Sequence, residues 1–142
     1  MPDSRTKIHR LMIAVNRIDE LYYRLLRTLS VKDNTFVLLY AISDGRSHTQ
    51  KQICDEWLIP RTTLNTVVNE CVQAGYIRLV ARGNKEKEIV LTDSGKAFAD
   101  SILTPIFAAE ERAMEPFLEQ GLVEQLESFT ERLDGEFQRM KE

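Results

Sequence analysis

Uncharged polar side chains gather on one face of the helix that the sequence predicts from about Pro60 to Ala74. At about 100° per residue, the apolar residues of this segment fall on one side, and amides and hydroxyls fall nearly opposite, with no acidic residue among them. A solvated helix face usually mixes Glu and Lys, whereas amides and hydroxyls are groups that read base edges in the major groove of DNA. The pattern therefore favours base reading, and a merely polar surface helix is the alternative. The inner residues are Leu64, Val67, Val68 and Cys71, and the outer ones are Thr62, Asn65, Thr66, Asn69 and Gln73.

Basic residues cluster again just after this helix. Two strand-like runs, residues 76–82 and 87–91, flank a short charged turn and predict a β-hairpin. Arg82, Asn84, Lys85 and Lys87 lie at or beside its tip. A basic hairpin that follows a reading helix is typical of a wing that contacts the phosphate backbone.

The charge distribution agrees with this location. The chain of 142 residues has a net charge of −3, yet residues 46–87 carry seven basic and only four acidic side chains. A positive block in an acidic chain favours a polyanionic partner at that place.

The elements that would position these groups are mostly helical. Apolar residues at three- and four-residue steps predict a long helix from about Arg5 to Leu29 and a shorter one that ends near Asp44-Gly45. Thr49 and Gln52 form a capping box, and the helix that they open is expected to turn Ile53, Trp57 and Leu58 inward. Ile59-Pro60 should stop that helix, since the residue before proline avoids helical geometry.

The last third of the chain is predicted to be helical as well. Residues 92–95 offer a helix start, Pro105 should kink the helix that follows, and Pro116 should end or kink it again. A final helix is expected from about Leu122 to Met140. The predicted fold class is mainly α with a small β-hairpin, a winged helix-turn-helix flanked by long N- and C-terminal dimerisation helices.

Three stretches resemble the MarR family of bacterial transcriptional regulators: residues 49–65, the run Gln-Ala-Gly-Tyr-Ile that ends at Ile77, and residues 84–95 with their Leu-Thr-x-x-Gly ending. The resemblance covers nearly the whole chain. It implies a single domain, 1–142, in which residues 5–30 and 97–141 form the dimerisation region and residues 32–95 form the DNA-binding lobe. It also implies a homodimer that binds a pseudo-palindromic operator in double-stranded DNA, with repression as the expected effect. The residues expected to contact DNA are Gln50, Lys51, Arg61, Thr62, Thr63, Asn65, Thr66, Asn69, Arg82, Asn84, Lys85 and Lys87.

Two residues of the hairpin depart from the family pattern. Gly83 stands where the family commonly has an aspartate, and Lys85 stands where it usually has an arginine. Lysine lacks the planar fork of arginine, so we expect this wing to anchor phosphate and not to read the minor groove.

Members of the family often respond to small phenolic or aromatic-acid ligands, so the resemblance also suggests a small aromatic or phenolic effector. The candidate ligand-binding residues are Arg17, Tyr22, Tyr23, Arg24 and Trp57. The alternative for Tyr22 and Trp57 is that they are simply core residues.

Other functions find little support in the sequence. His9 and His48 have no nucleophile or glycine-rich phosphate loop beside them, so we expect no enzyme, cofactor or metal. Cys54 and Cys71 lack zinc spacing and are expected to be small core residues, with a redox switch as the weaker alternative. The sequence shows no secretory signal and no apolar run of ~20 residues, which predicts a cytoplasmic protein without a membrane segment. A winged helix that binds protein instead of DNA is the remaining alternative.

Overall fold

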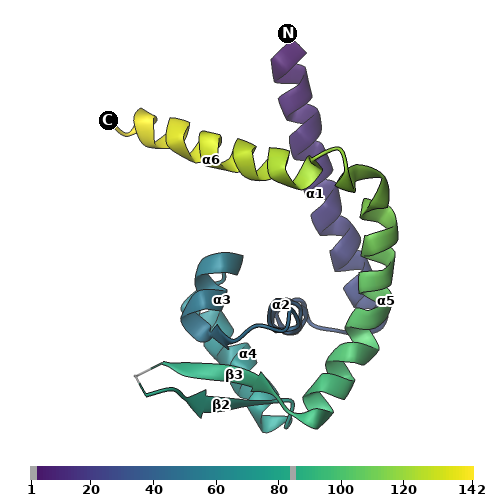
Figure 1. Ribbon diagram of the computed structural model, residues 1–142, viewed down its shortest axis with the longest axis vertical. Helices are drawn as coiled ribbons and strands as arrows, with labels where there is room; N and C mark the ends of the chain where they lie inside the picture. Colours follow the sequence, from purple (N-terminus) through teal and green to yellow (C-terminus); the bar gives the residue numbers. More distant parts are fainter. Residues whose placement is uncertain (1–2, 84–85) are drawn as a thin grey trace. The chain divides into compact units, whose positions relative to one another are not determined.

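The computed structural model describes residues 3–83 and 86–142 and confirms the predicted fold class, a winged helix with long helices at both ends. The chain forms two compact units, Met1–Asp100 and Ser101–Glu142, and helix α5 runs from the first into the second. The elements, labelled in Figure 1, are α1 (Asp3–Leu29), α2 (Asp33–Ile42), β1 (His48–Thr49), α3 (Gln50–Trp57), α4 (Arg61–Gln73), β2 (Ile77–Ala81), β3 (Lys87–Leu91), α5 (Asp93–Leu118) and α6 (Leu122–Met140).

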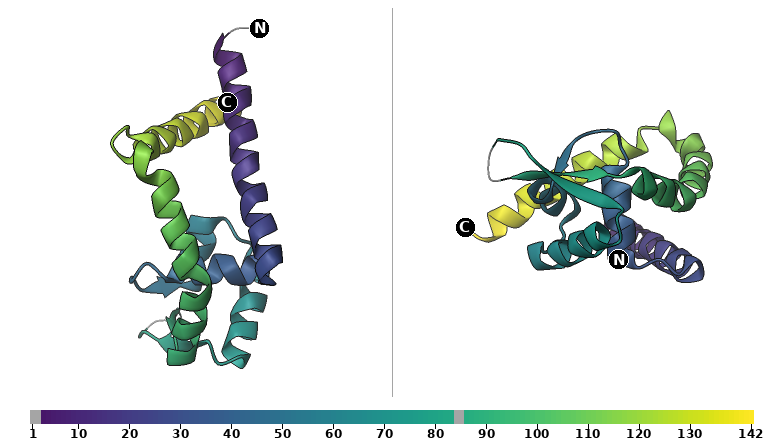
Figure 2. Two further views of the ribbon diagram at one scale, coloured as in Figure 1. Left: turned by 90° about the vertical axis from the view of Figure 1, so that its right-hand side faces the viewer. Right: turned by 90° about the horizontal axis from the view of Figure 1, so that it is seen from below.

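The sheet has one strand more than the predicted hairpin. Its order is β1-β3-β2, and both pairings are antiparallel. His48 of β1 and Leu79 of β2 lie on opposite sides of Ile89. Strand β1 has only two residues, too few for an alternating pattern to reveal it. Figures 1 and 2 show β2 and β3 as an arm that follows the end of α4.

The core of the first unit lies between the helices α2, α3 and α4 and the sheet. Leu38, Ile53, Leu64, Val68 and Ile77 are at most 2% exposed and belong to one apolar cluster. Burial of Leu64, Val67, Val68 and Cys71 confirms the predicted inner face of α4. The reading helix is therefore held along one side, and its opposite side is left to solvent.

The ends of α3 agree with the sequence in part. Thr49 and Gln52 form the predicted capping box: the Gln52 amide donates to Thr49 Oγ1 at 3.2 Å, and the Thr49 amide donates to Gln52 Oε1 at 2.9 Å. The expectation that Leu58 points inward is wrong, since 86% of Leu58 is exposed. Leu58 ends α3 with left-handed backbone, φ 53°, and this turns its side chain away from the core. Trp57 is 40% exposed and packs edge-on against Tyr40.

Pro116 does not end the helix in which it lies, which was one of the two outcomes expected for it. Pro105 and Pro116 both lie inside α5, and the helix continues past Pro116 to Leu118. The break falls instead at Gly121, which has a positive φ of 71° and precedes α6.

The terminal helices carry apolar side chains that their own chain does not cover. Leu26 is the only residue of α1 that is buried among those described. No residue of α6 is buried, and Phe137 and Met140 are 53% and 78% exposed. None of the helices in residues 3–83 and 86–142 combines the length and apolar character needed to span a membrane.

Candidate nucleic-acid interface

Helix α4 presents its polar face to solvent, as the sequence predicts. Thr62, Asn65, Thr66 and Asn69 are exposed on the side opposite the buried residues. The Thr66 hydroxyl donates to the carbonyl of Thr62 at 3.0 Å. Glu70 is exposed at the flank of this face and lies 3.8 Å from Lys32.

Thr63 differs from Thr62, Asn65, Thr66 and Asn69 because it is half-buried. It lines a hollow between α4 and the start of α2, and the exposed Thr66 also borders this hollow. The position of Thr63 one residue after Thr62 turns it about 100° around the helix. Thr63 is therefore better placed to hold α4 against α2 than to meet a base.

Two residues that are predicted to contact DNA, Gln50 of α3 and Asn65 of α4, form a hydrogen bond with each other. The Gln50 side chain, at the start of α3, donates from Nε2 to Oδ1 of Asn65 at 3.0 Å. Fifteen residues separate them, so no local pattern in the sequence predicts the contact. The bond fixes the Asn65 carboxamide and leaves its NH2 group as the donor available to a partner.

A groove of about 450 Å³ lies between the starts of α3 and α4 and the hairpin. Lys51, Arg61 and Lys87 line it, together with the acidic Glu86. Lys51 is 3.6 Å from Asp55, whereas Arg61 and Lys87 have no ion-pair partner within residues 3–83 and 86–142. The structure therefore brings three predicted cationic contacts to one hollow beside the polar face of α4.

Arg82 is held by an acidic residue that the sequence reasoning did not single out. Its Nη2 lies 2.7 Å from Oε2 of Glu88, whose side chain is only 16% exposed. Arg82 would have to leave Glu88, or share it, to bind a phosphate. The predictions for Asn84 and Lys85 fall outside the described residues.

The motif Leu-Thr-x-x-Gly joins the hairpin to α4. The Thr92 hydroxyl donates to the carbonyl of Gly75 at 2.5 Å and accepts the Gly95 amide at 3.0 Å. The Thr92 amide donates to the carbonyl of Tyr76 at 3.0 Å, and the Tyr76 ring stacks on Phe98 at 4.3 Å. These contacts tie the end of α4 to the start of α5 and so fix the arm that carries the wing.

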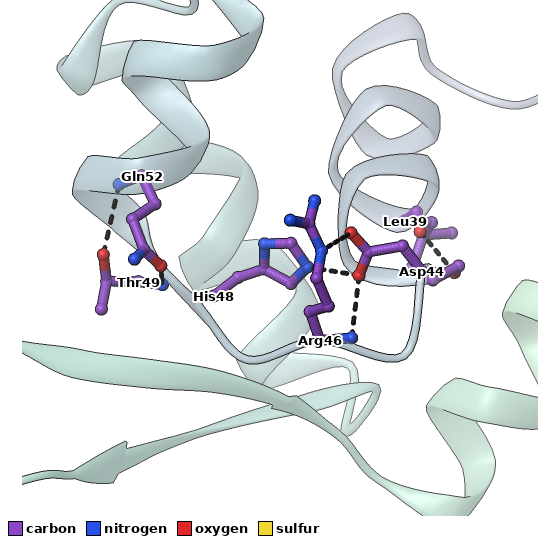
Figure 3. A network of polar contacts seen from close by, with 7 residues as sticks. Leu39, Asp44, Arg46, His48, Thr49 and Gln52 are labelled. Carbon is purple, nitrogen blue, oxygen red and sulfur yellow. Dashed lines mark hydrogen bonds and ion pairs between the residues drawn. The ribbon is translucent and has the colours of Figure 1, made fainter.

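A polar network holds the loop before α3, as Figure 3 shows. His48 is 4% exposed, and its Nε2 donates to Oδ1 of Asp44 at 2.7 Å. The amide and the Nε of Arg46 donate to the two oxygens of the same carboxylate, at 3.0 and 2.8 Å. Since His48 directly precedes the cap of α3, this network positions Gln50 and Lys51.

The Asp44 carboxylate should make the first unit sensitive to acid. The His48 hydrogen bond, followed by the Arg46 amide, holds the pKa of Asp44 well below its ordinary value of 3.8. A lowered pKa stabilises the fold above the ordinary value, and this contribution is lost progressively as the pH falls from about 5 toward 2. Asp44→Asn should therefore cost roughly 1 kcal/mol at neutral pH, because buried His48 loses its charged acceptor while water screens the Asp44 side chain, which is 34% exposed, and it should cost less in acid.

Urea unfolding followed by circular dichroism, at a series of pH values, would measure this difference. Asp55→Asn is the matched control because its pair with Lys51 is exposed at 3.6 Å and such pairs contribute little. An equal loss for Asp44→Asn at every pH would contradict the role given to its carboxylate.

Comparison with known proteins also indicates a winged helix of a known regulator type. Residues 29–87 match the model of the MarR family. The winged helix of this chain is therefore similar to the MarR family over those residues. No curated protein matches the chain in sequence.

Among solved structures, the MarR family regulator NMB1585 from Neisseria meningitidis superposes with a TM-score of 0.81 at 20% identity, covering 94% of this chain and 97% of that one. NadR in complex with 4-hydroxyphenylacetate gives 0.70 at 13% identity, covering 85% and 87%. PcaV from Streptomyces coelicolor, in complex with its natural ligand, gives 0.61 at 16% identity, covering 85% and 89%. At these identities the likeness shows a shared fold.

The first unit also contains an aromatic pocket of about 430 Å³ between α1, α2 and Trp57. Three of the five predicted ligand residues, Tyr22, Tyr23 and Trp57, line it. Arg17 and Arg24 do not, and Arg24 lies 3.6 Å from Glu20 instead. The charged side chains that do line the pocket are Asp19 and Asp33, which the sequence reasoning missed.

The two cysteines, Cys54 and Cys71, are both free thiols. Cys71 is 3% exposed on the inner face of α4. Burial, followed by the nearby Glu70 carboxylate, raises the pKa of the Cys71 thiol. A raised pKa lowers the thiolate fraction and with it the reactivity toward oxidants, so the surroundings of Cys71 favour a packing role.

Proposed function

We propose that this protein is a sequence-specific DNA-binding regulator of transcription that acts by binding and not by catalysis. The observation that carries the proposal is the exposed, acid-free face of α4 beside a groove lined by Lys51, Arg61 and Lys87. A helix of this kind fits the major groove and supplies donors and acceptors to base edges. The cations beside it suit the flanking phosphates.

We propose further that the regulator is a homodimer on a pseudo-palindromic operator, where its binding represses transcription. In support, Ile13 and Ile18 of α1 are 65% and 53% exposed, and the apolar side chains of α6 are also uncovered. Exposed apolar stripes of this kind mark interaction surfaces. Two chains related by a twofold axis would place two α4 helices about one turn of DNA apart, about 34–36 Å.

A small aromatic ligand bound in the pocket beside Trp57 would release the DNA. Two solved structures of this fold, those of NadR and PcaV, contain bound ligands. A ligand can shift DNA binding only if it binds the two conformations of the regulator unequally.

Selection of binding sites from random DNA, followed by gel shifts at two salt concentrations, tests this function. We expect a palindrome with half-sites about 10 base pairs apart, two chains per site, and affinity that falls steeply with salt. A winged helix that binds protein alone would select no sequence and would show no such salt dependence.

Lys87 provides a specific prediction about the wing. It is exposed at the start of β3, so Lys87→Ala should weaken binding to operator and random DNA alike and flatten the logarithmic salt slope by about one unit. Lys85, outside the described residues, carries the same expectation. Lys141→Ala, which removes an equal charge after α6, is the control. A sequence-dependent loss for Lys87→Ala would mean that the wing reads bases.

A further inference from the structure

The pocket in the first unit has a continuous aromatic wall. Tyr22 and Phe36 have ring centroids 6.0 Å apart, Phe36 and Tyr40 are 5.4 Å apart, and Tyr40 meets Trp57 edge-on at 5.6 Å. All four rings line a space of about 430 Å³, within the range of small-molecule sites. The wall therefore suits a flat or bulky apolar group.

The charged groups that line this pocket are all acidic. Asp19 of α1 and Asp33 of α2 border it, and no Lys or Arg is among its lining residues. In the described parts of the chain neither carboxylate takes part in a salt bridge. Two arginines of α1 have partners of their own: Arg24 lies 3.6 Å from Glu20, and Arg27 lies 5.5 Å from the ring centroid of Tyr23, which is itself a lining residue.

The contact of Arg27 with Tyr23 also shows how these rings interact with positive charge. The face of an aromatic ring attracts a cation through its quadrupole, and the gain increases where water is excluded. Carboxylates at the rim add attraction for a cation and repel an anion. Rings and carboxylates thus favour the same sign of charge in a ligand.

We propose that this pocket binds a hydrophobic organic cation, an aromatic group with a protonated amine, in preference to an aromatic acid. The ring would lie against Phe36, Tyr40 and Trp57, and the ammonium would lie toward Asp19 and Asp33. Binding of this cation does not depend on the proposed DNA-binding function. Only the expected consequence of binding, release of DNA, rests on that function. It differs from the aromatic-acid effector that the family resemblance suggests, because the arginines needed to hold a carboxylate lie outside the pocket.

Three probes of the same shape and different charge test this preference. Isothermal titration of the intact protein with 2-(1-naphthyl)ethylamine, 2-(1-naphthyl)ethanol and 1-naphthaleneacetate should rank them amine, alcohol, acid. We expect about a tenfold step between amine and alcohol, because the rim carboxylates are partly screened by water. Acid binding as tight as the amine, or no binding of any probe because a partner chain fills the pocket, would overturn the proposal.

Substitutions in the pocket test whether the two carboxylates cause the preference for the amine. The double change Asp19→Asn with Asp33→Asn should weaken the amine about tenfold and leave the alcohol within about twofold, since only the charge is removed. Trp57→Leu should instead weaken all three probes alike. Asp100→Asn, at an exposed carboxylate that does not line the pocket, should change nothing. Full amine affinity in the double variant would overturn the assignment.

A gel shift with the amine separates this inference from the proposed function. If the amine binds and operator is released, both stand. If the amine binds by calorimetry and the protein never retards DNA, the ligand class stands and the DNA-binding function fails. If the protein binds operator and the acid is the tighter probe, the function stands and the charge preference fails.

Discussion

Gly95→Ala should destabilise the winged-helix unit by about 3 kcal/mol or more, in the range reserved for severe core disruption. Gly95 is buried at the start of α5. A Cβ there would lie 1.7 Å from the carbonyl oxygen of Tyr76, 2.6 Å from its carbonyl carbon and 2.9 Å from its Cα. All three are backbone atoms, so no side-chain rotation can relieve the clash.

Neither the turn at residues 75–76 nor the start of α5 can move away from the other without breaking hydrogen bonds. Hydroxyls of Thr92 and Ser94 both donate to the Gly75 carbonyl, at 2.5 and 3.0 Å, and the Thr92 amide donates to the Tyr76 carbonyl. Moving α5 away would break these bonds and separate the stacked rings of Tyr76 and Phe98. Each of these three hydrogen bonds contributes about 1 kcal/mol. Moving α5 away from Tyr76 would therefore lose about as much free energy of folding as the clash itself.

Urea unfolding at a fixed protein concentration would measure this loss. The control is Gly135→Ala, the same substitution inside α6, where a Cβ would meet nothing within 4 Å. Alanine has the higher helix propensity, by about 1 kcal/mol, so this variant should be as stable as the parent or more so. Equal stability of the two variants would show that the α5 start is free to move.

This junction also shows what could be predicted from sequence and why. The start of α5 depends on a local signal, the Thr92 cap, so it was recognisable from residues 92–95. The inner and outer faces of α4 follow from its periodicity and were predicted residue by residue. The close approach of Gly95 to Tyr76 depends on where two helices meet in space, so the sequence marked the glycine without its physical reason.

The residues that the sequence did not reveal depend on contacts between elements that are distant along the chain. Asp44 and His48 depend on a strand of two residues, and the contact of Gln50 with Asn65 spans two helices. For the ligand pocket, the family resemblance suggested Tyr22, which lines the pocket, but the sequence could not decide which neighbouring charges faced inward. Asp19 and Asp33 line the pocket, and Arg17 and Arg24 do not, because this depends on how α2 packs against α1.

Asn65→Ala should relax the choice of base at one position in each half-site. Asn65 is exposed near the centre of the polar face, and its Oδ1 already accepts the Gln50 side chain at 3.0 Å. The bond occupies the Asn65 oxygen and leaves the NH2 of this exposed side chain to donate to an acceptor on a base edge. Loss of a well-placed base contact costs about 1–3 kcal/mol of discrimination, roughly fivefold to 150-fold in relative affinity.

Because Gln50 holds Asn65, the two side chains should act as a unit. Gln50→Ala would free the Asn65 carboxamide to rotate and would weaken the same base preference. The double variant should then lose less than the sum of the two single losses, with a coupling of about 0.5–3 kcal/mol for residues in contact. Competition binding against operators changed at each position would measure both quantities.

Random DNA and a distant asparagine provide the controls for this series. Asn65 is uncharged, so Asn65→Ala should leave affinity for random DNA and the salt slope as they are in the parent protein. Asn16→Ala, an equal change on the exposed surface of α1, should affect neither operator nor random DNA. If Asn65→Ala behaves like Asn16→Ala, the reading face of α4 is misplaced; if it flattens the salt slope instead, Asn65 lies against the phosphate backbone. Additive losses for Gln50 and Asn65 would mean that the bond between them does not survive on DNA.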